Sequence, residues 1–245
     1  MYVLSFYDVT GNAVRPWAEA GYHCVCFDIQ NKGKFERFSN GGWIHYRHAD
    51  LYSDETWHEL DREFSPHRAI VVNDVALVLG FPVCTDLAVS GAKHWESKRK
   101  ANPNFQSEAV GHAKRIAQFA NACDAPFAIE NPVGAMSTLW RKPNFYFHPF
   151  EYGGYIPHED AIHPDYPAYI APRDAYPKKT GIWSGNGFVQ PEKRPVDCPS
   201  GYSTQHLKLG GKSDKTKNIR SATPRGFARA VFEANGFPFI NKEVI

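Results

Sequence analysis

Short apolar runs and amphipathic helical patterns alternate along the first 130 residues of the chain. Residues 2–7 and 23–29 are apolar runs rich in β-branched and aromatic side chains, which predicts a strand at each. Between them, residues 13–20 predict a helix that ends at Gly21. A strand, a tight turn, a helix and a second strand predict a βαβ unit, in which the two strands are parallel.

The alternation continues beyond this unit. It predicts a strand at 43–46, a helix at 56–64, a strand across 69–72 and 75–79, a helix at 105–121 and a strand at 126–129. Strands that alternate with helices predict an α/β fold built on a parallel sheet, here of the Rossmann type. The basic and polar residues 93–104 predict a connection, and we expect it to form a lid over substrate.

The pattern changes after residue 138 and divides the chain into three parts. Residues 139–211 interleave aromatic side chains with prolines, histidines and lysines, and they show little helical period. We interpret 1–138 as a catalytic core, 139–211 as a loop-rich insertion that faces substrate, and 212–245 as a segment whose helix at 223–236 returns to the core. Aromatic and basic side chains suit base stacking and phosphate contact, but aromatic loops also pack against their own domain.

The composition is that of an ordinary globular chain. Its 245 residues are 42% hydrophobic and 22% charged, which is enough for one large α/β core. The formal net charge of +2 is too small to indicate a nucleic-acid partner by itself. Lysines and arginines still gather at 93–100 and 208–229, and each cluster is either a local basic face or a solvated surface.

Cysteine use and hydropathy bear on the compartment. The five cysteines are an odd set without paired metal-ligand spacing: Cys24, Cys26, Cys84, Cys123 and Cys198. Cys24 and Cys26 alternate along a predicted strand, so we expect their thiols to point the same way. Such a set is typical of a reducing compartment. With no signal peptide and no apolar run as long as a membrane span, we expect a cytoplasmic protein without a membrane partner.

Acidic residues follow three of the predicted strands. The turn Asp8-Val9-Thr10-Gly11-Asn12 follows the first, Asp28 ends the second, and Asp50 follows the run at 43–46. In Rossmann-type folds a turn of this kind lets the backbone approach a nucleoside, and an acid such as Asp28 accepts hydrogen bonds from ribose hydroxyls. Asp50 suits a contact to an adenine amino group, and its alternative is an N-cap or turn aspartate.

Cys84 and Glu130 are the candidate chemical groups. Cys84 follows the strand at 75–79, since Pro82 cannot continue a sheet ladder. The carboxyl ends of strands form the ligand crevice of an α/β sheet, so a thiol there suits a nucleophile. The alternative is a small buried hydrophobe. Glu130 follows the strand at 126–129, where burying a carboxylate is costly unless it serves a function, a salt bridge or a cap.

Taken together, these segments resemble the cytosine-C5 DNA methyltransferases, and more closely the short phage-type relatives of that family. Four segments appear in the family's order: residues 8–12 with 20–22 and 25–29, Gly80-Phe81-Pro82-Val83-Cys84, Phe127-Ala128-Ile129-Glu130-Asn131, and Arg220-Ser221-Ala222-Thr223-Pro224-Arg225 running to Arg229. The second is similar to the family's Gly-Phe-Pro-Cys loop, and the third to its Glu-Asn pair. The fourth is similar to its late Arg-x-Leu-Thr-Pro-Arg segment.

The resemblance implies a fold, a cofactor and a set of contacts. The fold is a Rossmann-like S-adenosylmethionine-dependent methyltransferase with an aromatic, loop-rich insertion. S-adenosyl-L-methionine is the implied cofactor, with no metal, and the implied partner is a flipped or single-stranded cytosine of DNA, or a cytosine nucleotide. If the chain is phage-encoded, its compartment is the host cytoplasm. The implied catalytic residues are Cys84, which adds to C6 of cytosine, and Glu130, which holds the base at N3 and the exocyclic amine.

The implied binding residues fall in two groups. Those for the cofactor are Asp8, Thr10, Gly11, Asn12, Asp28, Ile29, Asp50, Leu51 and Pro82. Those for the substrate are Thr85, Asp86, Ser90, Asn131, Arg220 and Arg225.

The chain also departs from the family's pattern. Val83 intrudes before Cys84, no arginine-rich strand is placed after the Glu-Asn pair, and most of a target-recognition domain is missing. The family's final Gly-Asn-x-Val element has no match near the C-terminus, and Gly11-Asn12-Ala13-Val14 imitates it at the wrong end.

Three alternatives therefore stay open. One is methylation of free dCMP, and another is an exocyclic-amine methyltransferase, although residues 130–133 lack that family's second proline and its aromatic. The third is a catalytically silent nucleic-acid-binding or anti-restriction protein. The sequence predicts no oligomeric state.

Overall fold

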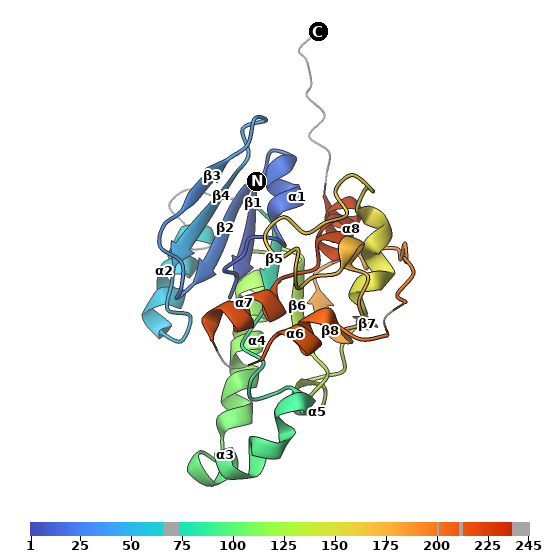
Figure 1. The fold of residues 1–245 in the computed structure, drawn as a ribbon. Coiled ribbons are helices and arrows are strands. Elements are labelled where there is room, and N and C mark those ends of the chain that lie inside the picture. The colour runs from blue at the N-terminus through green and yellow to red at the C-terminus, as the bar shows by residue number, and fades with distance from the viewer. Residues whose placement is uncertain (66–73, 200, 211–212, 237–245) are drawn as a thin grey trace.

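The computed structural model describes residues 1–65, 74–199, 201–210 and 213–236 (Figure 1). In these residues one eight-stranded sheet runs in the order β3-β4-β2-β1-β5-β6-β8-β7. The strands are β1 (Tyr2–Phe6), β2 (His23–Asp28), β3 (Phe35–Arg37), β4 (Trp43–His48), β5 (Val75–Gly80), β6 (Phe127–Pro132), β7 (Phe145–Phe147) and β8 (Thr180–Gly185).

Helices connect and cover these strands. The α-helices are α1 (Arg15–Glu19), α2 (Asp54–Phe64), α3 (Trp95–Ala101), α4 (Phe105–Ala122), α5 (Met136–Leu139), α6 (Thr204–Lys208), α7 (Asp214–Ser221) and α8 (Arg225–Asn235). The 3-10 helices are η1 (Val89–His94), η2 (Pro149–Tyr155) and η3 (Pro172–Asp174). Among the described helices, none is long and apolar enough to cross a membrane.

The centre of the sheet is parallel. β2 and β5 both pair with β1 in parallel, β4 pairs with β2, and β6 pairs with β5. β8 is antiparallel to both β6 and β7, and β3 is antiparallel to β4. The chain therefore forms β2 and β4 on one side of β1 and then crosses to the other side of β1, where it forms β5 and β6. This mixed α/β sheet is compatible with the expected Rossmann-like fold, and its switch point lies between β1 and β5, where such sheets bind ligands.

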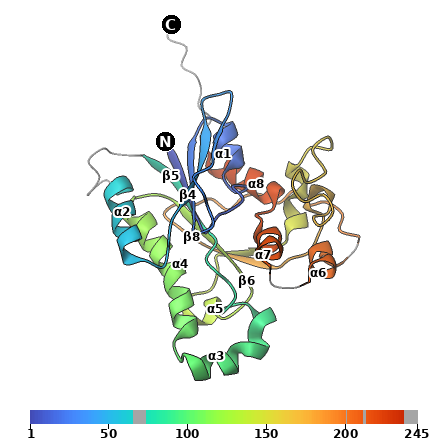
Figure 2. The same cartoon turned by 60° about the vertical axis from the view of Figure 1, so that its left-hand side comes forward.

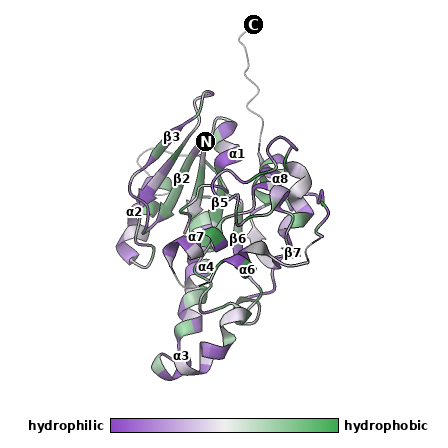
Figure 3. Cartoon of the chain, in the orientation of Figure 1, coloured by the Kyte–Doolittle hydropathy of each residue, from purple (hydrophilic) through white to green (hydrophobic). Residues whose placement is uncertain are grey.

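Each strand alternates its side chains between two cores. Leu4, Phe6, Val25 and Phe27 point to one face, where they pack against α2 and α4. The residues between them, which include Cys24 and Cys26, point to the other face, where α1 and α8 lie. The prediction that both thiols point the same way is confirmed. Figure 2 shows helices on both sides of the sheet, and Figure 3 shows apolar residues concentrated in its strands.

Several predicted elements differ from the structure. Residues 93–104 are not an irregular connection, because η1 and α3 occupy most of them. Three basic residues lie in the last turn of α3, where cations interact favourably with the helix dipole. Because such a basic run is also typical of a solvated connection, the helix was not predicted from the sequence. β3, α6 and α7 were not predicted, since each is short and mostly polar. The predicted strand at 69–72 lies outside the described residues.

The segment 139–211 divides between the sheet and its surroundings. It supplies β7 and β8, which extend the sheet beyond β6. Its remaining described residues are turns and short helices, in agreement with a loop-rich segment. Trp183 of β8 is 1% exposed and joins the same core as β1. Part of this segment therefore belongs to the core.

Candidate active site

The turn after β1 is organised by the carboxylate of Asp8. Its oxygens accept hydrogen bonds from the backbone N–H groups of Thr10 (3.0 Å) and Gly11 (2.8 Å) and from the Ser5 hydroxyl (2.8 Å). Gly11 has a φ of 68°, and a Cβ atom there would lie 2.5 Å from the hydroxyl oxygen of Tyr46. The position therefore requires glycine. Asp8 and Gly11 therefore fix the backbone conformation of the turn that was predicted to bind the cofactor.

Asn12, in the same turn, has unused hydrogen-bonding capacity. Its side chain is 7% exposed, and its Nδ2 has no hydrogen-bond partner in the described part of the chain. An unsatisfied buried donor costs about 1–3 kcal/mol, so such a group commonly meets a ligand or a water molecule. This amide is therefore suited to a ligand that enters the turn.

Asp28 and Ile29 lie at the carboxyl end of β2. Asp28 is 8% exposed and accepts a backbone hydrogen bond of 2.8 Å from the residue two positions later. Burial raises the pKa of its carboxyl group. The neighbouring Ile29 is 55% exposed, which leaves an apolar surface beside a polar one. Asn31 Nδ2 donates to the carbonyl oxygens of Asp8 (3.1 Å) and Cys26 (2.9 Å) and so holds the β1 and β2 ends together.

Asp50 and Leu51 follow β4. Asp50 is exposed, and its Oδ1 accepts a hydrogen bond of 3.0 Å from the backbone N–H of Tyr52. This hydrogen bond is typical of a turn-forming aspartate, and the contact to an adenine amino group stays a prediction. Leu51 is 3% exposed, and its carbonyl oxygen accepts from Trp57 Nε1 (3.0 Å) and the Tyr7 hydroxyl (3.3 Å). Leu51 is therefore buried beneath the surface, and its backbone carbonyl holds Tyr7 and Trp57 at this edge of the sheet.

Two tyrosines and a histidine that the sequence did not single out lie beside these acids. The Tyr7 hydroxyl is 3.0 Å from His112 Nδ1, and the His112 ring is 4.5 Å from that of Tyr52. Burial raises the pKa of Tyr7, and the charges of Asp28 and Asp50 raise it further. Tyr7 has a φ of 61°, a strained conformation for a non-glycine residue that recurs at functional sites. No pattern in the sequence marks this position.

The loop that carries Cys84 is fixed to β6. Asn131 is fully buried, and its Nδ2 donates a hydrogen bond of 3.0 Å to the carbonyl oxygen of Pro82. The backbone N–H groups of Leu87 and Ala88 donate to the Cys84 carbonyl oxygen at 3.0 and 2.9 Å. Asn131, expected as a substrate contact, thus holds the loop in place. Cys84 itself is partly exposed.

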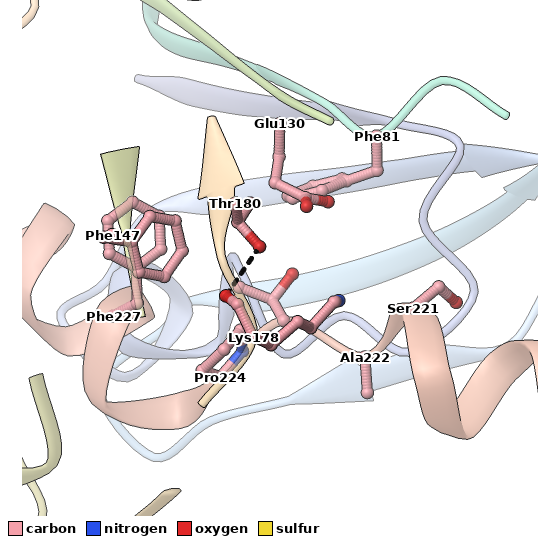
Figure 4. Close-up of a pocket in the computed structure, with 10 residues that line it drawn as sticks. Phe81, Glu130, Phe147, Lys178, Thr180, Ser221, Ala222, Pro224 and Phe227 are labelled. Atoms are coloured by element: carbon pink, nitrogen blue, oxygen red, sulfur yellow. Dashed lines mark hydrogen bonds between the residues drawn. The ribbon is translucent and has the colours of Figure 1, made fainter. Parts of the chain in front are cut away.

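A pocket lies beside this loop, and three separate sequence motifs supply its walls (Figure 4). Phe81 comes from the loop after β5, Glu130 comes from β6, and Thr223 and Pro224 precede α8. The other lining residues are Phe147, Lys178, Thr180, Ser221, Ala222 and Phe227. Figure 4 shows the Glu130 carboxyl oxygens turned into the pocket, with Lys178 opposite. The fold therefore brings together segments that are far apart in the chain.

Glu130 lies within β6 rather than after it, because the strand continues to Pro132. Its Oε1 is buried and has no hydrogen-bond partner among the residues that the structure describes. Burial raises the pKa of the carboxyl group, while the charge of Lys178 lowers it. A buried acid whose oxygen faces a pocket is suited to exchange a proton with a ligand.

Cys84 and Glu130 are electrostatically coupled. Burial raises the pKa of the Cys84 thiol, the Glu130 carboxylate raises it further, and the Lys178 charge lowers it. Protonation of Glu130 removes the repulsion and so favours the thiolate, which is the nucleophilic form. When Glu130 carries a proton, the pKa of the Cys84 thiol is therefore lower and a larger fraction of it is the reactive thiolate.

Lys178 is a member of the pocket that the sequence did not reveal. Its Nζ donates a hydrogen bond of 3.0 Å to the carbonyl oxygen of Arg220, just before the wall formed by residues 221–224. In the sequence it stands in a stretch crowded with prolines and basic residues, where no motif distinguishes it. The pairing of β8 with β6 brings it close to Glu130, and the sequence does not predict that pairing.

Of the three polar residues expected to contact substrate after Cys84, Thr85 and Asp86 lie in its loop and Ser90 lies in η1. Thr85 and Ser90 are exposed. The Asp86 carboxylate forms a salt bridge with Lys98 of α3, and its carbonyl oxygen accepts a hydrogen bond of 3.1 Å from Gln106. Asp86 thereby connects the loop to α3 and α4. Its carboxylate, which was expected to contact substrate, is paired with Lys98.

The two expected arginines do not line the pocket. Arg220 Nη2 donates to the carbonyl oxygen of Leu209 at 2.7 Å. Arg225 Nη2 donates to three consecutive carbonyl oxygens in residues 160–162, at 2.8, 3.3 and 3.1 Å. Arg225 therefore holds a loop of the 139–211 segment against α8. The backbone of Arg220, rather than its guanidinium, meets the pocket through Lys178.

A scan against protein-family models found no match to the chain, and a search of curated proteins found none either. The function is therefore inferred from the residues and the geometry described above.

Proposed function

We propose that the protein is an S-adenosylmethionine-dependent methyltransferase that acts on C5 of cytosine through Cys84. The observation that carries the proposal is the meeting of separate motifs at one pocket. Phe81, Glu130 and Pro224 line it, and Cys84 is close enough to Glu130 for their charges to interact. A nucleophile and an acid held near one another at a strand-end crevice are parts that this reaction needs.

The fold supports the proposal in a second way. From β4 through β2, β1, β5 and β6 the parallel strands follow the doubly wound order, and antiparallel β8 is inserted before β7. This arrangement resembles the sheet of S-adenosylmethionine-dependent methyltransferases. The cofactor-binding and nucleophile motifs then lie along the same edge, since parallel strands end together.

The residues at the β1 and β2 ends fit the cofactor. Asn12 Nδ2 is a buried donor without a partner in the described structure, and Gly11 gives the turn before it a left-handed backbone conformation. Asp28 suits ribose hydroxyls, and the exposed Ile29 suits the face of an adenine ring. When bound, S-adenosylmethionine supplies an electrophilic methyl group carried on a sulfonium.

The residues of the pocket fit the chemistry at cytosine. Addition of Cys84 Sγ to C6 forms a carbon–sulfur bond, and the displaced electron pair moves through the ring to N3, where Glu130 gives its proton. C5 then has enamine character and takes the methyl group. A solvent base removes the proton from C5, Cys84 leaves as a thiolate while the C5–C6 double bond forms again, and the proton on N3 returns to Glu130. Because a stacked base cannot reach the thiol, the cytosine must be flipped, single-stranded or free.

Covalent trapping tests the proposal directly. DNA or nucleotide that carries 5-fluorocytosine should form a lasting adduct with Cys84 when S-adenosylmethionine is present, because fluorine at C5 leaves no proton to remove. Cys84→Ser should lose both the adduct and turnover. Cys198→Ser is the matched control, since Cys198 is also partly exposed but its thiol bonds to the carbonyl oxygen of Ala175. Full activity of Cys84→Ser would overturn the C5 mechanism.

Product analysis separates the proposal from its alternatives. Labelled methyl transfer is measured with duplex DNA, single-stranded DNA and dCMP, and the methylated base is identified by chromatography and mass. A methyl group at C5 supports the proposal, and one on the exocyclic amine replaces it with the exocyclic-amine mechanism. No transfer to any of the three substrates, with intact cofactor and DNA binding, would indicate a silent binding protein.

A further inference from the structure

We propose that Tyr46 is a positioning residue for the turn at residues 8–12, here called the cofactor turn. Its buried hydroxyl holds the backbone of Thr10 and Gly11 in the conformation that receives S-adenosylmethionine. This inference rests on the proposed function. It goes beyond the family motifs found in the sequence, none of which includes Tyr46.

The sheet places the Tyr46 side chain against this turn. β4 pairs with β2 in parallel so that Tyr46 lies beside Cys26, and both side chains belong to the core that α1 and α8 cover. Tyr46 is 5% exposed. A Cβ atom on Gly11 would lie 2.5 Å from the Tyr46 hydroxyl oxygen and 2.9 Å from the ring carbon that bears it. The end of the phenol ring therefore contacts the backbone of the cofactor turn directly.

The hydroxyl group of Tyr46 meets two acceptors. It donates to the carbonyl oxygen of Thr10 at 3.4 Å and to Glu36 Oε1 at 3.2 Å, so its one proton is shared between them. The N–H of Thr10 donates to Asp8 Oδ1 at 3.0 Å. The backbone of Thr10 is thus held at both ends, by Asp8 at its amide and by Tyr46 at its carbonyl group.

Glu36 of β3 fixes the phenol in turn. Its carboxylate accepts hydrogen bonds from Arg15 Nη2 at 2.9 Å and from Lys34 Nζ at 2.5 Å. Burial opposes the charge of Glu36, but the hydrogen bonds from Lys34 and Arg15 outweigh it and lower the pKa of the carboxyl group. Arg15 is the first residue of α1, which follows the cofactor turn. Glu36 therefore ties Tyr46 to the helix that begins where the turn ends.

The position of Thr10 decides where the free donor of the turn lies. The N–H of Asn12 donates to Thr10 Oγ1 at 3.3 Å, and Asn12 Nδ2 is the buried donor without a partner in the described structure. A turn that is held in place before a ligand arrives binds it without the cost of ordering the backbone. Tyr46 therefore raises cofactor affinity without touching the cofactor.

The first test needs no cofactor and follows the turn alone. Tyr46→Phe keeps the ring and removes the hydroxyl group. Amide hydrogen exchange at Thr10 and Gly11, measured by NMR, should become about threefold to tenfold faster, the scale of one net hydrogen bond. Exchange at the wild-type rate would overturn the positioning role.

Tyr152→Phe is the matched control. Tyr152 is fully buried in the same core, and its hydroxyl donates to the carbonyl oxygen of Pro191 at 3.3 Å, in the 139–211 segment. This variant loses a comparable hydrogen bond, so its unfolding temperature should fall as that of Tyr46→Phe does. Its exchange at Thr10 and Gly11 should remain that of wild type.

A second pair of variants tests the support of the phenol. Glu36→Gln should speed exchange at the same two amides, because a neutral amide binds Arg15 and Lys34 more weakly than a carboxylate does. Glu63→Gln is its control, since Glu63 pairs with Arg47 at 2.6 Å, and Arg47 points to the opposite face of β4 from Tyr46.

The last test measures S-adenosylmethionine itself. Tyr46→Phe should weaken binding in calorimetry about threefold to tenfold and raise the KM for the cofactor by the same factor, while kcat at saturating cofactor stays unchanged. Tyr152→Phe should bind as wild type does, which a general loss of stability would not explain. If wild type binds the cofactor and Tyr46→Phe binds it equally well, the role of Tyr46 is wrong and the proposed function stands. If wild type binds no S-adenosylmethionine, the proposed function fails and this role fails with it.

Discussion

Glu130 and Asp174 are two acids that the fold removes from water, with different consequences. Glu130 keeps an oxygen without a partner in the described structure and faces a pocket. Asp174 is 1% exposed, and its Oδ2 accepts a hydrogen bond of 2.9 Å from the backbone N–H of Gly226 at the start of α8. Burial raises the pKa of Asp174 to about 6. The first acid is placed to meet a ligand in the pocket, and the second accepts a hydrogen bond at the start of a helix while its burial disfavours its charge.

The raised pKa of Asp174 predicts a pH dependence of stability. The folded state binds this proton more tightly than the unfolded state, where an aspartate has a pKa of about 3.9. The stabilisation is therefore fully present below about pH 4 and is lost as the pH rises through the folded value of about 6. A shift of two pKa units corresponds to a loss on the order of 3 kcal/mol.

Asp174→Asn should remove this dependence. Asparagine cannot ionise, its oxygen can accept the Gly226 hydrogen bond, and it tolerates the φ of 52° found at this position. Urea unfolding from pH 4 to pH 7 should show the variant gaining on wild type by roughly 3 kcal/mol. A difference in unfolding free energy that stays constant with pH would contradict this assignment.

Glu130→Gln tests the acid of the pocket. The substitution keeps the shape of the side chain and removes the transferable proton. Methyl transfer should slow by about two orders of magnitude or more, the usual scale for the loss of a general acid or base. Circular dichroism and S-adenosylmethionine binding should remain those of wild type. Equal rates in the two proteins would show that N3 is protonated by another group.

At the scale of elements, the sequence predicted the parts with strong periodicity. β1, β2, β5, β6, α2 and α4 were all predicted, because their apolar residues recur at the spacing of a strand or a helix. Glu130 and Cys84 were placed at neighbouring strand ends for the same reason. Lys178 and Tyr7 were missed, because their positions in the candidate site depend on strand pairing and backbone conformation rather than on a local pattern. α3 was missed because its charge is as typical of a solvated connection as of a polar helix.

The link between β6 and the Cys84 loop is the element-scale feature that the site depends on. Asn131→Ala would leave the buried Pro82 carbonyl oxygen without its donor. The unfolding free energy should fall by about 1–3 kcal/mol, and 5-fluorocytosine trapping should slow because the loop loses an anchor.

Asn121→Ala is the control for that experiment. Asn121 lies exposed near the end of α4, and its side chain bonds to Asn186 at the surface. This variant should stay within about 0.5 kcal/mol of wild type in stability and should trap at the wild-type rate. Similar losses in both variants would mean that the Asn131 bond has no special part in positioning Cys84.

At the scale of the whole molecule, late segments of the chain close the edge of the sheet where the early motifs end. Asn218 of α7 bonds to Gln30 after β2 at 3.3 Å, and Lys178 before β8 bonds to Arg220 of the same helix. α7 therefore connects the expected cofactor side to the pocket side. Residues 221–224 line the pocket, whereas neither Arg220 nor Arg225 does. The side chains of these two arginines hold neighbouring segments.

α3 and the start of α4 extend beyond the edge where the parallel strands end (Figure 1), and their basic residues offer a test of DNA against a free nucleotide as the ligand. Lys93 and Arg99 are exposed in η1 and α3, while Lys98 and Lys100 are paired with acids of this region.

If this surface contacts duplex DNA, its cations should release counterions from the DNA phosphates, and binding should weaken as salt rises. The double variant Lys93→Gln, Arg99→Gln should then reduce the slope of log affinity against log salt by up to about 2, since each phosphate contact contributes roughly 0.9. Fluorescence anisotropy with labelled duplex across a salt series measures the slope, and Arg62→Gln on exposed α2 is the control that should leave it unchanged. Binding that ignores salt, or binding confined to mononucleotides, would exclude duplex DNA as the ligand of this surface and would favour dCMP as the substrate.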